Sequence, residues 1–253
     1  MSGSTGRLRV SDLSGVRTIT IDRAEAKNAL STAMRVELCE LLASAEQSVD
    51  VHAVVIAAVD PVFTAGVDFK DLQPATDRYD AQFAVNPGRA LRAMRTPVVC
   101  AVNGACVSGG LEIVLSASFA VASDRARFAD THARLDAVPT WGLTALLPRA
   151  VGIRKAREMS ITGNFVDAEE ALRIGIVNHV VPHAELSRFT QELAEQIACT
   201  RAVGEVLALY DQGQDLSVDA ALALEARATA TRSVDPDAFA AAGRAAAARQ
   251  RSL

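Results

Sequence analysis

The sequence has few aromatic residues and no long apolar run. Tryptophan, tyrosine and phenylalanine make up only 4% of the 253 residues, although half of all residues are hydrophobic. Alanine, valine and leucine must therefore fill most of the core. The length suits one large domain, or one domain with an appendage.

Other absences argue against two kinds of partner. The formal net charge is −4, and no basic run interleaved with aromatic residues occurs, as a nucleic-acid-binding surface would require. The first ten residues contain no apolar leader, and no apolar stretch approaches the roughly 20 residues that span a bilayer. We therefore expect a cytoplasmic protein that binds neither nucleic acid nor membrane.

Cysteine and histidine are sparse and show no ligand spacing. The four cysteines, Cys39, Cys100, Cys106 and Cys199, form no C-x-x-C pair. We expect reduced thiols, most of them buried. His179 and His183 are four residues apart, but Pro182 interrupts a helical face between them and no further ligands follow. We expect no metal site.

The first half of the chain alternates between strand and helix patterns. Apolar and polar residues alternate over residues 8–21, interrupted by Ser-Gly, which predicts a β-hairpin. Ser31 is a predicted N-cap, and helical apolar spacing continues to about Val49. Residues 53–59 and 97–102 are short apolar strands. Residues 71–88 lack periodicity, so we expect a mobile surface segment there.

The second half ends in helices alone. Residues 111–118 predict a buried helix, and residues 119–123 and 176–181 predict strands. Asp167 and Glu170 have the spacing of a capping box, and Gly175 is the expected end of that helix. From His183 onward the pattern is only helical. Strands that alternate with helices, followed by helices alone, indicate an α/β core with a helical C-terminal appendage.

The stretch VNGACVSGGLE, residues 102–112, places two adjacent glycines after a predicted strand. It lacks the lysine of a Walker A loop after its second glycine and the glycine spacing of a Rossmann fingerprint. Cys106 stands where a nucleophile elbow around Ser108 needs glycine, so we interpret Ser108 as a small packing residue.

A helix that begins near residues 108–110 could instead bind a negatively charged group at its N-terminus. Its first N–H groups lack intrahelical partners and carry a partial positive charge, which suits a carbonyl oxygen that becomes negative during a reaction. A second turn, FTAGVDF at residues 63–69, also follows an apolar strand. The two turns could direct two N–H groups at one oxygen, or they could be ordinary connections between strands and helices.

Four blocks of sequence resemble the crotonase, or enoyl-CoA hydratase/isomerase, superfamily: IDRAEAKNALS, VFTAGVDF, PVVCAVNGACVSGGLEIVLSASFAVASDRARFA and VDAEEALRIGIVNHVVP. They occur in order between about Val16 and Pro182. The resemblance implies an α/β spiral of ββα units at residues 1–195 and a helical trimerisation region at residues 196–253. It also implies a trimer or hexamer, an acyl-CoA substrate and no separate cofactor.

The same resemblance assigns site residues. By position, Val67 and Gly109 would supply the two N–H groups of an oxyanion hole, and Glu112 matches the first of two family glutamates. The second glutamate position, twenty residues later, holds His132, which is the main departure from the family pattern. Substrate and CoA contacts are expected from Ala26, Lys27, Ala65, Gly66, Asp68, Gly110 and Trp141.

The resemblance implies hydration of a trans-2-enoyl-CoA, with Glu112 acting on the water and His132 assisting. Because His132 replaces a glutamate, two alternatives stay open: isomerisation or other enolate chemistry, and acyl-CoA binding without turnover. Thr140 occupies the position of an aspartate that dienoyl-CoA isomerases and aryl-CoA dehalogenases use, which argues against both activities. Residues 71–94 are expected to shape the acyl pocket.

Overall fold

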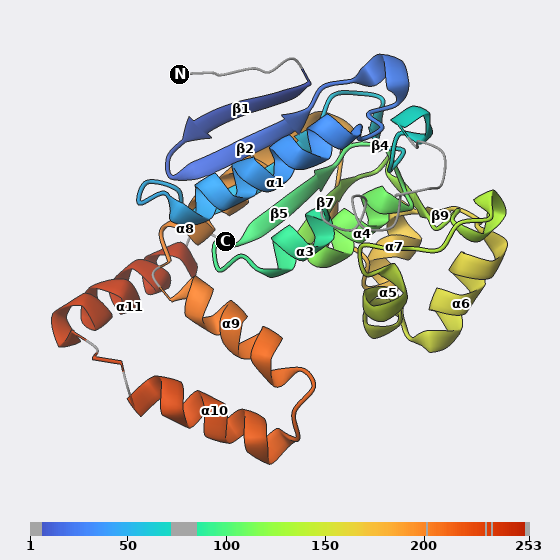
Figure 1. Ribbon diagram of the computed structural model, residues 1–253. Coiled ribbons are helices and arrows are strands. Elements are labelled where there is room, and N and C mark those ends of the chain that lie inside the picture. Colours follow the sequence, from blue (N-terminus) through green and yellow to red (C-terminus); the bar gives the residue numbers. More distant parts are fainter. Residues whose placement is uncertain (1–6, 72–84, 201, 231, 234, 251–253) are drawn as a thin grey trace. The chain divides into compact units, whose positions relative to one another are not determined.

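A computed structural model describes residues 7–71, 85–200, 202–230, 232–233 and 235–250 (Figure 1). The chain divides into two compact units, Met1–Gly204 and Glu205–Leu253. The domain boundary expected at residues 195/196 lies nine residues before this division, within a helix. The segment expected to be a mobile surface segment lies largely outside the described residues, at 72–84.

A six-stranded sheet forms the centre of the first unit. Its order is β1-β2-β3-β5-β7-β10, and every neighbouring pair is parallel except β1 and β2. The predicted hairpin is confirmed: Leu8 pairs with Ile21 and Leu13 with Val16. The strands are β1 (Leu8–Leu13), β2 (Val16–Ile21), β3 (Ala53–Ala58), β5 (Val98–Val102), β7 (Phe119–Ser123) and β10 (His179–Val181).

A second, four-stranded sheet was not predicted from the sequence. It consists of β4 (Val62–Thr64), β6 (Ala105–Val107), β8 (Arg127–Ala129) and β9 (Val166–Asp167), in that order. After β3, β5 and β7 in the large sheet, the chain places the next strand in the small one. The connection from β5 to the following helix is therefore not the simple tight turn that the sequence suggested, because it includes β6. Strands of two or three residues are too short to show an alternating pattern.

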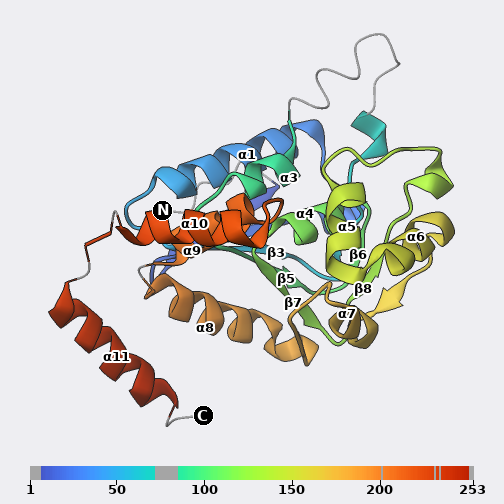
Figure 2. The same cartoon turned by 90° about the horizontal axis from the view of Figure 1, so that it is seen from below.

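Helices cover both faces of the large sheet (Figures 1 and 2). One face packs against α1 (Thr32–Gln47), α3 (Pro87–Arg92) and α4 (Gly109–Ser116), and the other against α8 (Leu186–Ala198). Alternate strand residues go to opposite faces, as the pleat requires: Ile56 joins the core beneath α1 and α4, whereas Val55 joins the one beneath α8. Ser31 caps α1 as predicted, because its side chain accepts the Met34 N–H at 3.2 Å.

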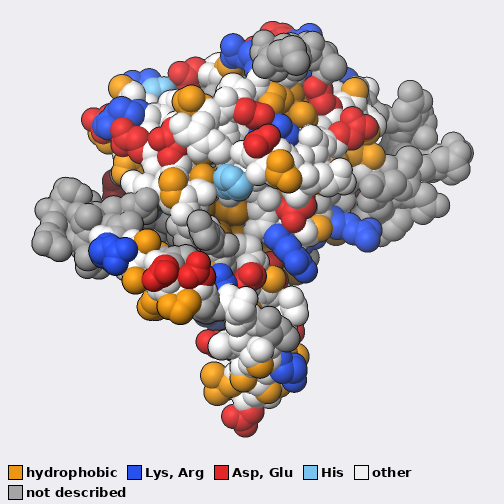
Figure 3. All heavy atoms as spheres, turned by 90° about the vertical axis from the view of Figure 1, so that its left-hand side faces the viewer, with side chains coloured by type: hydrophobic (Ala, Val, Ile, Leu, Met, Phe, Trp, Pro, Cys, Tyr) orange, Lys and Arg blue, Asp and Glu red, His pale blue; other side chains and the backbone are white. Residues whose placement is uncertain are grey.

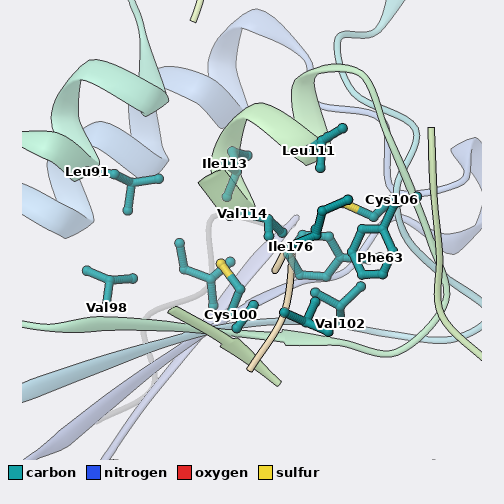
Figure 4. Close-up of a cluster of buried hydrophobic side chains, with 14 of the residues drawn as sticks. Phe63, Leu91, Val98, Cys100, Val102, Cys106, Leu111, Ile113, Val114 and Ile176 are labelled. Carbon is teal, nitrogen blue, oxygen red and sulfur yellow. The ribbon is translucent and has the colours of Figure 1, made fainter. Parts of the chain in front are cut away.

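Small aliphatic side chains and thiols fill the core (Figure 4). Leu111, Ile113 and Val114 on α4 belong to the same buried cluster as strand residues such as Val102. Cys100 and Cys106 are buried there, while Cys39 is half-buried and Cys199 is exposed. The low aromatic content is thus compensated by close packing of many small residues.

Three further helices of the first unit are connected to the small sheet: α5 and α6 lie between β8 and β9 in the chain, and α7 follows β9. The sequence did not predict α3, α5 or α6, whereas α7 has its predicted ends: Asp167 accepts the Glu170 N–H at 2.9 Å, and Gly175 closes the helix with φ of 86°. The helices are α5 (Leu143–Val151), α6 (Ile153–Thr162) and α7 (Ala168–Ile174), with 3₁₀ turns at Ala24–Ala26, Phe69–Asp71, Ala133–Leu135 and His183–Glu185.

The second unit is helical. Neither α9 (Val203–Gly213) nor α10 (Val218–Ala230) contains a buried residue among those described, and α11 (Pro236–Gln250) completes the chain's described part. Large hydrophobic side chains are exposed on these helices, namely Val206, Tyr210, Val218, Leu222 and Phe239. Exposed large apolar side chains close together are typical of surfaces that take part in contacts with other molecules or segments.

On the face shown in Figure 3, acidic and basic side chains are interspersed with small groups of hydrophobic ones. Within the described ranges, we find no helix with the length and apolar character needed to cross a bilayer.

Candidate active site

The two turns singled out in the sequence lie against each other. A Cβ atom placed on Gly66 would be 3.0 Å from the backbone nitrogen of Gly109, and one placed on Gly109 would be 3.3 Å from the Cα of Gly66. Gly66 also has φ of 87°, in the region that favours glycine. The turns after β4 and β6 therefore meet, and only residues without a side chain allow the approach.

Two backbone N–H groups are left without acceptors at this junction. Leu30 fixes the first turn, because its N–H donates to the Gly66 carbonyl at 2.8 Å and its carbonyl accepts the Asp68 N–H at 3.0 Å. In this parallel bridge the hydrogen bonds are made by Gly66 and Asp68, so the Val67 N–H points away from Leu30 and takes no part in the pairing. Gly109 is the first residue of α4, so its N–H has no intrahelical acceptor. Among the described residues, neither N–H donates a hydrogen bond to another residue.

Ser108 connects this junction to the loop after β8. Its backbone has φ of 49° and ψ of −104°, which is strained for a residue with a side chain. Its Oγ accepts the Thr131 N–H at 3.0 Å and lies 2.8 Å from the Thr131 Oγ1. The sequence suggested only a packing role, since a positive φ at serine has no sequence signal.

Glu112 lies one helical turn after Gly109 and is only 1% exposed. Its Oε1 accepts the N–H groups of Trp141 at 2.6 Å and Leu143 at 3.2 Å. Burial raises the pKa of Glu112 above its ordinary value, and these two hydrogen bonds offset the rise only in part. Glu112 is thus a buried carboxyl group whose acid form is favoured relative to an exposed glutamate.

Arg92 supports the segment that holds Glu112. One of its guanidinium nitrogens donates to the Trp141 carbonyl at 2.8 Å and to the Ser116 Oγ at 2.9 Å. The Trp141 peptide is therefore held at its carbonyl by Arg92 and at its N–H by Glu112. Arg92 lies in a helix that the sequence did not predict, so its role had no local signal.

His132 faces the second oxygen of Glu112. Its Nε2 lies 3.9 Å from the Glu112 Oε2, which is too long for a direct hydrogen bond but short enough for one water molecule to bridge. On the other side of the ring, Nδ1 lies 2.6 Å from the Asp130 Oδ1. The His132 ring therefore lies between two carboxyl groups, with Glu112 near Nε2 and Asp130 at Nδ1.

Asp130 was not identified from the sequence, although it stands two residues before His132 in FADTH. Its Oδ1 also accepts the His132 backbone N–H at 3.1 Å. Burial opposes its ionisation, but hydrogen bonds from His132 and from the Ser160 side chain outweigh burial and lower the pKa of Asp130. Asp130 is therefore an ionised, buried acceptor beside the imidazole.

Trp141 forms one wall of the junction of the two turns. A Cβ atom on Gly109 would be 2.9 Å from the indole Cζ3, so the ring lies directly on this glycine. Arg35 is buried, and its guanidinium carbon lies over the Trp141 ring, 6.0 Å from the ring centroid. In the part of the chain that the structure describes, the indole Nε1 has no hydrogen-bond partner.

The other predicted contact residues have mixed surroundings. Lys27 is exposed, and its carbonyl accepts the Ala65 N–H at 3.1 Å, which places both beside the Gly66 turn. Ala26 is half-buried in the 3₁₀ turn just before them. Gly110 packs on β4, since a Cβ atom there would be 2.7 Å from the Thr64 Cγ2.

The carboxylate of Asp68 is bound by the side chain of Arg23 and the backbone of Lys70. Its Oδ2 lies 2.5 Å from a guanidinium nitrogen of Arg23, and its Oδ1 accepts the Lys70 N–H at 3.0 Å. The hydrogen bond from Arg23 lowers the pKa of Asp68 in spite of burial. This ion pair anchors the chain directly after Val67.

A separate cavity of about 400 Å³ lies between the large sheet and α8, on the face opposite α4. None of the predicted site residues lines it. Its lining includes Thr18, Thr20, Asp60, Asn103, His183 and Thr190. Over the described ranges, no three histidine, cysteine or acidic side chains converge as metal ligands.

Comparison with known proteins gives a consistent result. Residues 12–234 match the family model described as enoyl-CoA hydratase/isomerase. The chain is 32% identical over 213 residues to the probable peroxisomal enoyl-CoA hydratase 1 of Arabidopsis thaliana, covering 83% of this chain and 80% of that protein. It is 33% identical over 219 residues to the short-chain-enoyl-CoA hydratase of Clostridium acetobutylicum, covering 84% of each.

A solved structure shows the same fold. The crystal structure of an enoyl-CoA hydratase from Mycobacterium avium superposes with a TM-score of 0.73 and is 42% identical, covering 87% of this chain and 94% of that one.

Proposed function

Because the chain belongs to the enoyl-CoA hydratase/isomerase family, we propose that it is a hydro-lyase that adds water across the double bond of a trans-2-enoyl-CoA. One observation carries the proposal: Glu112 and His132 face each other across a gap of 3.9 Å that one water molecule can bridge. Gly109, which carries one of the two N–H groups without acceptors, lies one helical turn before Glu112 on α4. The proposal needs no cofactor beyond the CoA thioester itself.

The N–H groups of Val67 and Gly109 are the proposed oxyanion hole. They would hold the thioester oxygen and stabilise the negative charge that it gains in the enolate. The N-terminus of α4 adds its partial positive charge at the same point. Loss of one such donor costs about a hundred- to a thousandfold in rate.

The bridging water is the proposed nucleophile. Its oxygen bonds to C3 of the substrate while one of its protons leaves to the acid–base pair, and C2 then receives a proton to give a 3-hydroxyacyl-CoA. Lys27 is exposed beside the Gly66 turn, which supports a contact with the CoA phosphates. The oxyanion hole, the water and the acid–base pair together account for the bond from oxygen to C3 and the new proton on C2.

Crotonyl-CoA hydration, followed by the loss of enoyl-thioester absorbance, tests the proposal. We expect wild-type turnover that falls by about a hundred- to ten-thousandfold in Glu112→Gln. Glu158→Gln, at an exposed position on α6, is the matched control and should retain full activity. No wild-type turnover, combined with a gain in His132→Glu, would contradict hydration and favour another acyl-CoA reaction.

Because His132 stands in place of the second glutamate, two alternatives to hydration stay open. One is isomerisation or other enolate chemistry, for which one base is enough, and product analysis would detect it. The other is acyl-CoA binding without turnover. The single tryptophan, Trp141, packs on Gly109, so its fluorescence should change when a thioester binds. Saturable fluorescence change with no product would favour binding alone.

We also propose that the second unit mediates self-association as a trimer or hexamer. The exposed Tyr210 on α9 and Leu222 on α10, two helices in which no described residue is buried, support this, as does the exposed Phe239 on α11. Light scattering of the full chain should give a multiple of the 26.7 kDa chain mass. Leu222→Glu should lower that mass, and a monomeric wild type would contradict the proposal.

A further inference from the structure

We infer that Asp130 is a positioning residue that makes His132 the base of the reaction, with Glu112 as the acid that protonates C2. The inference deepens the proposed hydration and rests on it. It exchanges the roles that the family resemblance implies, in which Glu112 acts on the water and His132 assists. It also gives a function to a carboxylate that lies outside the pair of family glutamate positions.

The hydrogen bonds around Asp130 determine which ring nitrogen carries the proton. Its Oδ1 accepts the His132 backbone N–H at 3.1 Å and lies 2.6 Å from Nδ1, while Ser160 also hydrogen-bonds the carboxylate. An ionised carboxylate can only accept hydrogen bonds, so Nδ1 must be the donor. In the neutral imidazole, Nε2 then has a lone pair directed toward the gap beside Glu112.

The charges around the pair favour this division of roles. Asp130 is the acidic group in contact with the far side of the ring, and it stabilises the imidazolium that forms when Nε2 accepts a proton. Glu112 on α4 is more deeply buried, and burial raises its pKa. The hydrogen bonds from the Trp141 and Leu143 N–H groups and the charge of His132 act on the pKa of Glu112 in the opposite direction, but burial outweighs them.

The resulting step balances. Nε2 of His132 removes a proton from water, the water oxygen bonds to C3, and the π electrons of C2=C3 pass to the thioester oxygen held by the two N–H groups. The enolate collapses as C2 takes the proton from the Glu112 carboxyl group. When the product leaves, a second water molecule enters the gap, and the proton on Nε2 passes through it to the Glu112 carboxylate, which restores the starting state.

Nitrogen NMR of the full chain, labelled with ¹⁵N-histidine, tests the orientation without reference to turnover. The sequence has only four histidines, and His132→Gln assigns the signal of interest by its loss. We expect the neutral His132 ring to carry its proton on Nδ1. Asp130→Asn should shift the ring toward the Nε2–H form, and an Nε2–H ring in the wild type would overturn the inference.

Kinetics test the consequence. Asp130→Asn should lower kcat for crotonyl-CoA by about a hundred- to ten-thousandfold with a much smaller change in KM. Asp136→Asn changes an exposed aspartate in the same loop and should leave kcat unchanged. If Asp130→Asn does not fold, Ser160→Ala, which removes one hydrogen bond to Asp130, should lower kcat in the same direction.

Infrared spectroscopy tests the role of Glu112. The wild type minus Glu112→Gln difference spectrum should contain a carboxylic-acid carbonyl band at neutral pH. Only carboxylate bands would overturn the acid role. Wild-type kcat in Asp130→Asn would overturn the role of His132 as an oriented base. By contrast, a wild type that does not hydrate crotonyl-CoA would defeat the proposed function, while the NMR result would still decide the orientation of His132.

Discussion

The side chain of Ser108 accepts the Thr131 N–H at 3.0 Å and lies 2.8 Å from the Thr131 hydroxyl oxygen. Ser108 directly precedes Gly109, and Thr131 directly precedes His132. One side chain therefore links the residue before the proposed oxyanion donor to the residue before the proposed base. These two groups are otherwise in different strand–helix units of the fold.

Substitution of Ser108 should separate positioning from strain. Ser108→Ala and Ser108→Gly both remove the hydrogen bonds to Thr131, so we expect kcat for crotonyl-CoA to fall by up to about a hundredfold in each. Ser108→Gly should be the more stable of the two by about 1 kcal/mol, because glycine adopts φ of 49° without strain. Thermal unfolding and steady-state kinetics check this, and full activity in Ser108→Gly would show that the hydrogen bonds do not position His132.

Gly66→Ala should impair the oxyanion hole. The new Cβ would lie 3.0 Å from both the Gly109 nitrogen and the Val107 carbonyl oxygen. We expect a loss of about a hundredfold or more in kcat, together with about 1–2 kcal/mol of stability from the positive φ. Gly152→Ala is the matched control, since Gly152 has φ of 78° and no neighbour within 4 Å of such a Cβ. It should lose similar stability but keep its activity; equal kinetic losses would contradict the steric argument.

The ion pair between Asp68 and Arg23 should make stability depend on pH. The folded-state pKa of Asp68 is lowered, so its contribution is fully present above the unfolded-state pKa of about 3.9 and is lost as pH falls through the folded-state pKa. Asp68→Asn should lower the free energy of unfolding by about 1.5–3 kcal/mol at neutral pH. The difference from the wild type should shrink as pH falls below about 4.

Asp22→Asn serves as the control for that measurement. Asp22 pairs with Arg9 at the surface at 2.9 Å, where ion pairs contribute about 0–1 kcal/mol. Chemical denaturation at several pH values gives both comparisons. A constant deficit of Asp68→Asn across the acidic range would show that the carboxylate charge is not what stabilises the turn.

Thiol reactivity should follow burial. Burial raises the pKa of Cys100 to about 12 and that of Cys106 well above its ordinary value, so both should stay unreactive in the native protein. Exposed Cys199 should react fast with a disulfide reagent and half-buried Cys39 slowly. Cys199→Ser should remove the fast phase, and a fast phase that survives this substitution would contradict the burial of the other thiols.

The sequence predicted the hairpin of β1 and β2, the Ser31 cap of α1 and both ends of α7. These features depend on neighbouring residues: alternation, a side chain that caps its own helix, and a glycine at a helix end. The α/β spiral expected from the family resemblance is confirmed by the match of residues 12–234 and by the superposed crystal structure. The roles assigned to individual site residues stay predictions.

The tertiary structure alone decided the rest. The strands of the small sheet are too short to show a pattern and exist because they pair with one another across long separations in the chain. Likewise, the positive φ of Ser108 and the position of the His132 ring between Glu112 and Asp130 depend on contacts between units. Local sequence therefore determined which residues could supply N–H groups and acid–base side chains. Packing of distant segments determined which oxygen of Glu112 faces His132, and which carboxylate holds the other side of its ring.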